Sequence, residues 1–206
     1  MKKKNLILIG GGGHAVSLLN LIYRNKKNLN VIGYTDNKKT NLRINYIGND
    51  KKLIQVNKFK KISLVMAIGS HIKIRSKLFK FYKDKNYNFL TIVDKSAVIG
   101  HKSKILEGSI IFPNSVIGPE TIIEENVVCH SGSIIEHNSV VKNNSYIGPG
   151  AIVCGHSVIE KNVLIGANSC IIENIRIKEG CTLGAGAVLV KNFTNKNKVL
   201  LGIPAK

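Results

Sequence analysis

The sequence predicts two domains: an α/β domain with a Rossmann-like half-fold over residues 1–90, and a parallel β-helix built from hexapeptide repeats over residues 91–206. Apolar patterns typical of strands and helices alternate in the first part. In the second part an apolar residue recurs at every sixth position. The charge changes at the same boundary, because residues 1–90 hold 20 Lys or Arg against 3 Asp or Glu (+17), whereas residues 91–206 hold 11 against 9 (+2).

Strands and helices are expected to alternate through the first ninety residues. Apolar runs predict strands over residues 5–9, 31–35 and 62–68. Helical spacing of apolar residues predicts amphipathic helices over residues 15–24 and 72–82. The glycines between the first strand and the first helix predict a tight turn. This order is typical of a small parallel sheet, about half of a dinucleotide-binding fold.

The second half carries a strict period of six residues. Steps of six from Val93 reach seventeen positions, and every one of them is apolar. They are Val93, Ile99, Ile105, Ile111, Ile117, Ile123, Cys129, Ile135, Val141, Ile147, Val153, Ile159, Ile165, Ile171, Ile177, Leu183 and Leu189. At 44% apolar composition, a run of this length has a chance probability of roughly 10⁻⁶. We call these positions the anchors.

The residue four positions after each anchor is small or β-branched. From Ala97 to Ala187, fifteen of these sixteen residues are Ala, Ser, Thr, Val or Cys, and Ile175 is the exception. A short strand followed by a turn, repeated in this way, forms one wall of a prism whose inward side chains stack from coil to coil. Three hexads close one coil, so seventeen hexads give between five and six coils.

Composition excludes several classes of protein. With 44% hydrophobic residues and a mean hydropathy of +0.05, the chain can bury a core, and no apolar stretch approaches the roughly 18 residues of a membrane span. The basic opening at Lys2–Lys4 imitates a signal peptide, but glycines interrupt the apolar run that follows. The four cysteines are 25, 16 and 11 residues apart, which favours a reduced, cytoplasmic protein.

The net charge of +19 does not predict a nucleic-acid partner. The lysines are scattered and lack an aromatic platform or a recognised nucleic-acid motif. Lys, Asn and Ile are abundant together, which indicates A/T-rich codon usage. A second interpretation is that the basic first domain attracts a substrate bearing a diphosphate.

The turn after the first strand has a weak phosphate-binding pattern. Gly10-x-Gly12-x-x-Ala15 fits the fingerprint G-x-G-x-x-G/A, in which glycines let the backbone approach a phosphate at a helix N-terminus. The domain lacks the second half of a dinucleotide fold, so one nucleotide diphosphate is a better match than NAD. The alternative is that these glycines only form a tight turn.

Six segments, in order, resemble one family. They are Ile9-Gly-Gly-Gly-Gly-His14-Ala15, Gly33-Tyr-Thr-Asp36, Ala67-Ile-Gly69, Ser133-Ile-Ile-Glu136-His137, Gly184-Ala-Gly186 and Gly202-Ile-Pro-Ala-Lys206. Together they resemble the NeuD/PglD-like sugar acetyltransferases. The resemblance implies a left-handed β-helix, a homotrimer and acetyl-CoA as co-substrate. It implies as acceptor the 4-amino group of a UDP-4-amino-4,6-dideoxy sugar or, alternatively, a hydroxyl of sialic acid.

The resemblance also implies roles for individual residues. In the first domain it implies a nucleotide-sugar site formed by Gly12, Gly13, His14, Asp36, Asn37 and Gly69. Along the β-helix, between neighbouring subunits, it implies an acetyl-CoA site formed by Tyr146, Gly155, Ala167 and Ala185. Gly155 would offer its N–H to the thioester carbonyl. The alternative is that Gly155 and the two alanines only satisfy the repeat.

His137 matches the general-base position of the family. It lies two residues beyond the anchor Ile135, so it is expected off the packed core, and imidazole titrates near neutral pH. Many relatives carry Glu or Asp directly after this histidine, where this chain has Asn138. Asn138 can orient the ring without ionising. Glu136 is a weaker candidate for that role, because neighbouring side chains of a strand point to opposite faces.

Two other classes of function stay open. A zinc lyase of the carbonic anhydrase type would use His130, His137 and His156, but these stand one, two and three residues after their anchors and do not share a column. We therefore predict no metal. A non-catalytic nucleotide-sugar-binding protein is the other alternative. Cys129 is itself an anchor and no cysteine has a neighbouring base, so no covalent cysteine intermediate is expected.

Overall fold

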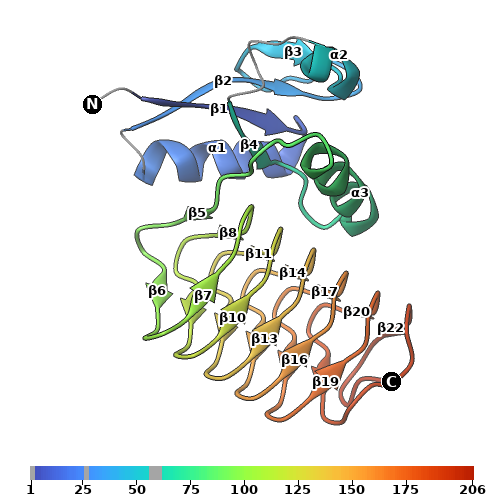
Figure 1. Ribbon diagram of the computed structural model, residues 1–206. Coiled ribbons are helices and arrows are strands. Elements are labelled where there is room, and N and C mark those ends of the chain that lie inside the picture. The colour runs from blue at the N-terminus through green and yellow to red at the C-terminus, as the bar shows by residue number, and fades with distance from the viewer. Residues whose placement is uncertain (1–2, 26–27, 56–61) are drawn as a thin grey trace. The chain divides into compact units, whose positions relative to one another are not determined.

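The computed structural model describes residues 3–25, 28–55 and 62–206; Lys2, part of the basic opening, lies outside these ranges. The chain divides into two compact units, Met1–Leu90 and Thr91–Lys206 (Figure 1). In the described residues, no helix has the length and apolar character that crossing a membrane requires.

The first unit is a parallel sheet with three helices. Its elements are β1 (Lys4–Ile9), α1 (Gly13–Asn25), β2 (Leu29–Thr35), β3 (Tyr46–Gly48), α2 (Asp50–Gln55), β4 (Ser63–Met66) and α3 (Ile72–Lys83). The sheet order is β3-β2-β1-β4. The three strands and two helices expected from the sequence are all present. The sequence analysis missed β3 and α2, because elements of three and six residues are too short for a periodic signal.

The middle of this sheet is buried. Leu6, Ile7, Leu8 and Ile9 of β1 are at most 1% exposed, as expected for a parallel strand covered on both faces. β2 and β3 lie on one side of β1, and β4 lies on the other. The chain direction across the sheet therefore reverses at β1, and such a reversal opens a ligand crevice at the carboxyl ends of the strands.

The second unit is a left-handed parallel β-helix of about six coils, which confirms the predicted fold class. The seven-stranded face holds β5 (Ile92–Val93), β8 (Ile110–Ile111), β11 (Val128–Cys129), β14 (Tyr146–Ile147), β17 (Leu164–Ile165), β20 (Thr182–Leu183) and β22 (Val199–Leu200). The six-stranded face holds β6 (Val98–Ile99), β9 (Val116–Ile117), β12 (Ile134–Ile135), β15 (Ile152–Val153), β18 (Cys170–Ile171) and β21 (Val188–Leu189). The five-stranded face holds β7 (Lys104–Ile105), β10 (Ile122–Ile123), β13 (Val140–Val141), β16 (Val158–Ile159) and β19 (Arg176–Ile177).

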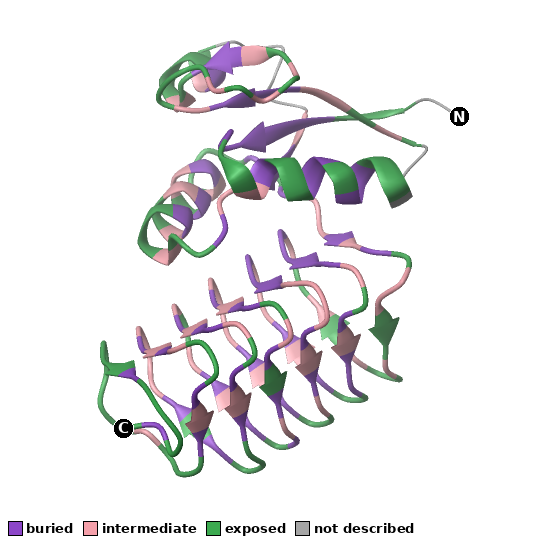
Figure 2. Ribbon diagram, turned by 180° about the vertical axis from the view of Figure 1, so that it is seen from behind, coloured by how far each residue is buried: buried purple, intermediate pink, exposed green. Residues whose placement is uncertain are grey.

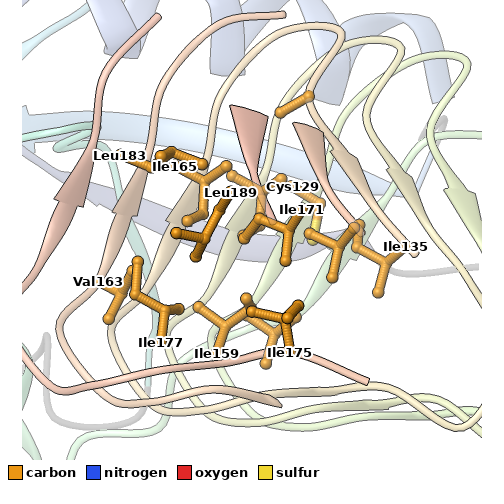
Figure 3. Packing of buried hydrophobic residues seen from close by; sticks show 14 of the residues in the cluster. Cys129, Ile135, Ile159, Val163, Ile165, Ile171, Ile175, Ile177, Leu183 and Leu189 are labelled. Carbon is orange, nitrogen blue, oxygen red and sulfur yellow. The ribbon is translucent and has the colours of Figure 1, made fainter. Parts of the chain in front are cut away.

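The strands stack in the register that the hexads predict. Val128 pairs with Tyr146, eighteen residues later, so three hexads close one coil. Fourteen successive anchors, from Ile111 to Leu189, are completely buried, and Figure 3 shows part of this stack. At the N-terminal end of the stack Ile99 is 40% exposed, since the first coil has a stacked neighbour on one side only. Figure 2 shows, for the whole ribbon, which segments of the coils are buried and which are exposed.

Serine hydroxyls explain the small residues that follow the anchors. The hydroxyl of Ser157 donates to the carbonyl of Ile172 (3.0 Å) and accepts the N–H of Ile175 (3.2 Å) in the next coil. Ser145 makes the same pair of hydrogen bonds with Glu160 and Val163. Where serine occupies this buried position, its hydroxyl satisfies backbone groups that the strand ladder does not reach.

The third residue after an anchor has a left-handed backbone in every hexad from Ile99 to Leu183. The fifteen residues are Lys102, Gly108, Asn114, Glu120, Asn126, Gly132, Asn138, Asn144, Gly150, His156, Asn162, Asn168, Asn174, Gly180 and Gly186. Gly and Asn tolerate this conformation best. The abundance of Asn and Gly at this position was a sequence signal for the turn, and it gives Asn138 a backbone role besides any catalytic one.

Candidate active site

The glycines in the turn after β1, Gly10 to Gly13, have two different roles. Gly10 has a φ of 105°, and a Cβ on Gly11 would lie 2.3 Å from the ring of Tyr34, so folding requires both glycines. Gly12 and Gly13 are exposed, and a Cβ on either would meet no atom within 4 Å. The fold leaves these two positions open at the N-terminus of α1, where backbone N–H groups favour an anion.

His14 and Gly69 meet at the β1/β4 reversal. Gly69 is buried just after β4, and a Cβ there would lie 2.9 Å from Nδ1 of His14. The buried guanidinium of Arg75 in α3 donates to the Gly69 carbonyl (3.2 Å) and fixes this loop. The structure therefore brings together two residues that are 55 positions apart in the sequence, at the reversal of strand order where α/β folds commonly bind ligands.

Asp36 joins this group from the end of β2. Its carboxylate accepts the N–H of Gly11 (2.8 Å) and the N–H of Asn37 (2.7 Å). Asp36 is half-buried and Asn37 is exposed. The resemblance implies that Asp36 belongs to the nucleotide-sugar site, and the structure shows that its carboxylate holds the glycine turn against β2.

His137 lies in the turn between β12 and β13, exposed and off the core. Its Nδ1 is 3.1 Å from Oδ1 of Asn138, and Nδ2 of Asn138 donates to Oε2 of Glu120 (3.0 Å). Glu136 makes no such contact with His137 in the described structure, so Asn138 is the neighbour that orients the ring. The sequence analysis missed Glu120; the available signal was its position eighteen residues, one coil, before Asn138.

Gly155 lies in the coil above His137 in the same column. A Cβ on Gly155 would lie 2.8 Å from both Cε1 and Nε2 of His137, so only glycine leaves room for the ring in this orientation. Gly155 is two residues after an anchor, where Pro113, Pro119 and Pro149 also occur. The ladder therefore does not use an N–H at this position, and Nε2 of His137 lies against Gly155.

The three histidines of the zinc alternative do not gather. His137 and His156 are neighbours, with ring centroids 5.1 Å apart. His130 instead stacks on Phe112 (4.4 Å) and lies 6.1 Å from Tyr146, and burial lowers the pKa of His130. Across residues 3–25, 28–55 and 62–206, no three His, Cys, Asp or Glu side chains are placed to hold one metal ion.

The residues assigned to acetyl-CoA fall on two edges of the prism. Gly155 lies with His137 where the six-stranded face meets the five-stranded face. Ala167 and Ala185 follow β17 and β20, where the seven-stranded face meets the six-stranded face, and Tyr146 is on β14 of the seven-stranded face. One chain therefore does not bring these residues to one place.

The cysteines do not form a nucleophilic centre. None of the four forms a disulfide, and Cys129 is completely buried in the anchor column. Cys154 is next to Gly155, but burial raises the pKa of its thiol, which keeps it protonated. Beside Gly155, the imidazole of His137 is therefore better suited than the Cys154 thiol to accept a proton.

Comparisons with known proteins agree with this two-part architecture. Residues 5–82 match the family model of the PglD N-terminal domain, and residues 156–191 match the model described as bacterial transferase hexapeptide (six repeats). The fold and these matches define a hexapeptide-repeat protein with an N-terminal domain of the PglD type. The resemblance to the NeuD/PglD-like sugar acetyltransferases is thereby confirmed.

Solved structures share the fold over nearly the whole chain. PerB from Caulobacter crescentus, solved with CoA and GDP-perosamine, has 22% identity and a TM-score of 0.90, with coverage of 98% of this chain and 96% of that one. The acetyltransferase domain of PglB from Neisseria gonorrhoeae has 20% identity and a TM-score of 0.92, with 99% of each chain covered. WeeI from Acinetobacter baumannii has 19% identity and a TM-score of 0.80, again with 99% of each covered. A search of curated proteins gave no match.

Proposed function

We propose that this protein is an acetyl-CoA-dependent N-acetyltransferase that acts on a nucleotide-linked amino sugar, with a UDP-4-amino-4,6-dideoxy sugar as the expected acceptor. The observation that carries the proposal is the group of His137, Asn138 and Gly155, in which the histidine ring is oriented through Nδ1 while Nε2 lies against Gly155. The neighbour PerB, solved with CoA and GDP-perosamine, supports this class of substrates.

The chemistry assigns a separate task to each residue of this group. Nε2 of His137 accepts the proton of the sugar amine as the amine nitrogen attacks the thioester carbonyl. The C–S bond then breaks, and the proton passes from the imidazolium to the departing thiolate, so the products are the N-acetyl sugar and CoA. The N–H of Gly155 would donate to the developing oxyanion, a contribution of about 2.7–4 kcal/mol for a preorganised donor of this kind.

The first domain would hold the nucleotide diphosphate. The open positions at Gly12 and Gly13 let phosphate oxygens approach the N-terminus of α1. Asn37 is exposed beside Asp36, where a nucleoside would be contacted, and His14 packs on Gly69 at the expected sugar end. The charge of +17 over residues 1–90 would attract the diphosphate. The four cysteines are thiols outside any disulfide, which supports a cytoplasmic location.

A panel of acceptors tests this function and separates the alternatives. Release of the CoA thiol is followed with UDP-linked and GDP-linked 4-amino-4,6-dideoxy sugars and with free sialic acid. We expect turnover with a nucleotide-linked amino sugar. Turnover with sialic acid alone would favour O-acetylation. Binding of a nucleotide sugar without thiol release would favour the non-catalytic alternative.

The same arrangement supports a homotrimer. The outward positions of the six-stranded face are apolar in every coil: Val98, Val116, Ile134, Ile152, Cys170 and Val188. This face borders both the edge with His137 and the edge with Ala167 and Ala185. In a trimer whose six-stranded faces lie toward a threefold axis, the His137 edge of one chain lies next to the alanine edge of the neighbouring chain. The proposed acetyl-CoA residues of the two edges then lie in one site.

We expect sedimentation to show a trimer at micromolar concentration. Ile152→Glu, which places a charge in the proposed interface where Ile152 is 36% exposed, should give monomers that retain their circular dichroism. Val140→Glu on the five-stranded face is the matched control and should leave the assembly intact. A monomeric wild-type protein, or equal effects of the two variants, would argue against this interface.

Asn138→Asp should retain turnover. A carboxylate beside His137 favours the protonated ring, so the limb of the pH–rate profile on which activity rises should shift to higher pH. Glu120 lies 3.0 Å from the Asn138 amide and would repel the new carboxylate. We therefore expect a larger rate in the double variant Asn138→Asp/Glu120→Gln than in the single one. An unchanged pH profile in both variants would mean that residue 138 does not act on His137.

A further inference from the structure

We propose that Glu120 is a positioning residue for the base: through Asn138, it sets which ring nitrogen of His137 carries the proton. The effect of Glu120 on catalysis rests on the proposed function, whereas its effect on the tautomer of His137 does not. The contacts are the 3.1 Å approach of His137 Nδ1 to Asn138 Oδ1 and the 3.0 Å hydrogen bond from Asn138 Nδ2 to Glu120 Oε2.

The direction of these hydrogen bonds follows from the chemistry of the three groups. An ionised carboxylate only accepts, so the end of the Asn138 side chain that faces Glu120 must be the NH₂ group. The opposite end, which faces His137, is then the carbonyl oxygen, and this oxygen also only accepts. Nδ1 of His137 must therefore be the donor. In the neutral ring the lone pair is left on Nε2, the nitrogen that lies against Gly155.

The backbone keeps the three side chains in this order. Glu120 and Asn138 are in consecutive coils at the same repeat position, and both have left-handed φ angles, of 57° and 55°. The N–H of Asn138 donates to the carbonyl of Pro119 (3.0 Å), and the N–H of His156 donates to the carbonyl of His137 (3.0 Å). Stacking of the coils thus brings Glu120 to Asn138, and the arrangement supplies the carboxylate that Asn138 itself lacks.

We call the hydrogen-bonded series Glu120, Asn138 and His137 the relay. A hydrogen-bond donor at position 120 should reverse the direction of its hydrogen bonds. In Glu120→Lys the ammonium would donate to the oxygen of Asn138, and the NH₂ group would turn toward His137 and donate to Nδ1. The single proton of the neutral ring would then be on Nε2. Lysine suits this backbone position, because Lys102 occupies it one coil earlier with a φ of 58°. Glu120→Gln keeps the shape and removes the charge, so it serves as the second variant if the lysine variant does not fold.

The direct measurement is the imidazole ¹⁵N spectrum of His137 in histidine-labelled protein, with the signal assigned through His137→Gln. We expect an Nδ1–H tautomer in the wild type and an Nε2–H tautomer in Glu120→Lys. In Glu120→Gln the new amide can either accept from or donate to Asn138, so we expect a mixture of the two His137 tautomers.

Glu136→Gln is the matched control, since it removes a carboxylate from the same edge without touching the relay, and it should leave the ¹⁵N spectrum of His137 unchanged. In the acetyl-transfer assay, kcat of Glu120→Lys should fall by about tenfold to a hundredfold, as for other outer partners of functional histidines, with little change in KM. The inference is overturned if the His137 tautomer in both Glu120→Lys and Glu120→Gln matches that of the wild type. If the tautomer changes but no acceptor is acetylated, the relay stands and the proposed function fails.

Discussion

Replacing His137 by alanine should lower kcat by about 10²–10⁴-fold, the usual contribution of a positioned general base. The affinity for acetyl-CoA should change little, because the ring acts on the acceptor amine and lies off the core. Steady-state kinetics with the preferred acceptor, together with acetyl-CoA binding by calorimetry, give both quantities. Because His137 is exposed, the variant should unfold at the same temperature as the wild type.

His101→Ala provides the matched control for this experiment. His101 is also two residues after an anchor and also exposed, two coils earlier on the same edge. Unlike His137, which has Asn138 and Gly155, it is not followed by an asparagine and has no glycine at the equivalent position of the next coil. Its removal should leave kcat unchanged within about twofold. A His137→Ala enzyme with nearly full activity, or equal losses in the two variants, would remove His137 from the mechanism.

Ile147→Ala should lower the free energy of unfolding by about 2–5 kcal/mol, the range for a large buried aliphatic residue truncated to alanine. Ile147 is completely buried in the anchor column, with stacked anchors in the coils on both sides. Neighbouring coils are tied by the strand ladder and cannot collapse into the cavity, so the loss should lie well inside this range. Urea unfolding followed by circular dichroism measures it.

Ile99→Ala separates the effect of burial from that of the residue type. Ile99 is an anchor of the same register and the same chemistry, but it is 40% exposed at the end of the stack. It should therefore cost less than half as much as Ile147→Ala, since less apolar surface is removed from contact. Equal costs at the two positions would show that the stacked core does not control the stability of the prism.

Much of the fold could be predicted because repetition multiplies a weak signal. One apolar residue in six says little, but seventeen in one register leave no helix or hairpin that would bury them all. The same register correctly placed Cys129 inward and His137 outward. In the first domain β3 and α2 escaped prediction, because neither is long enough to show a period.

The sequence by itself determined the local part of the candidate site: His137 outside the core, Asn138 beside it, and a glycine turn after the first strand. These are properties of neighbours along the chain and of a fixed repeat. Only the tertiary structure decided which distant side chains meet. Stacking of the coils brought Glu120 to Asn138 and Gly155 to His137, and the parallel sheet brought Gly69 to His14. It also placed the proposed cofactor residues on two edges of the prism. The physical reason is that hydrogen bonds and ring contacts depend on distances of about 3–5 Å, which the spacing of residues along a chain does not specify until the backbone is folded.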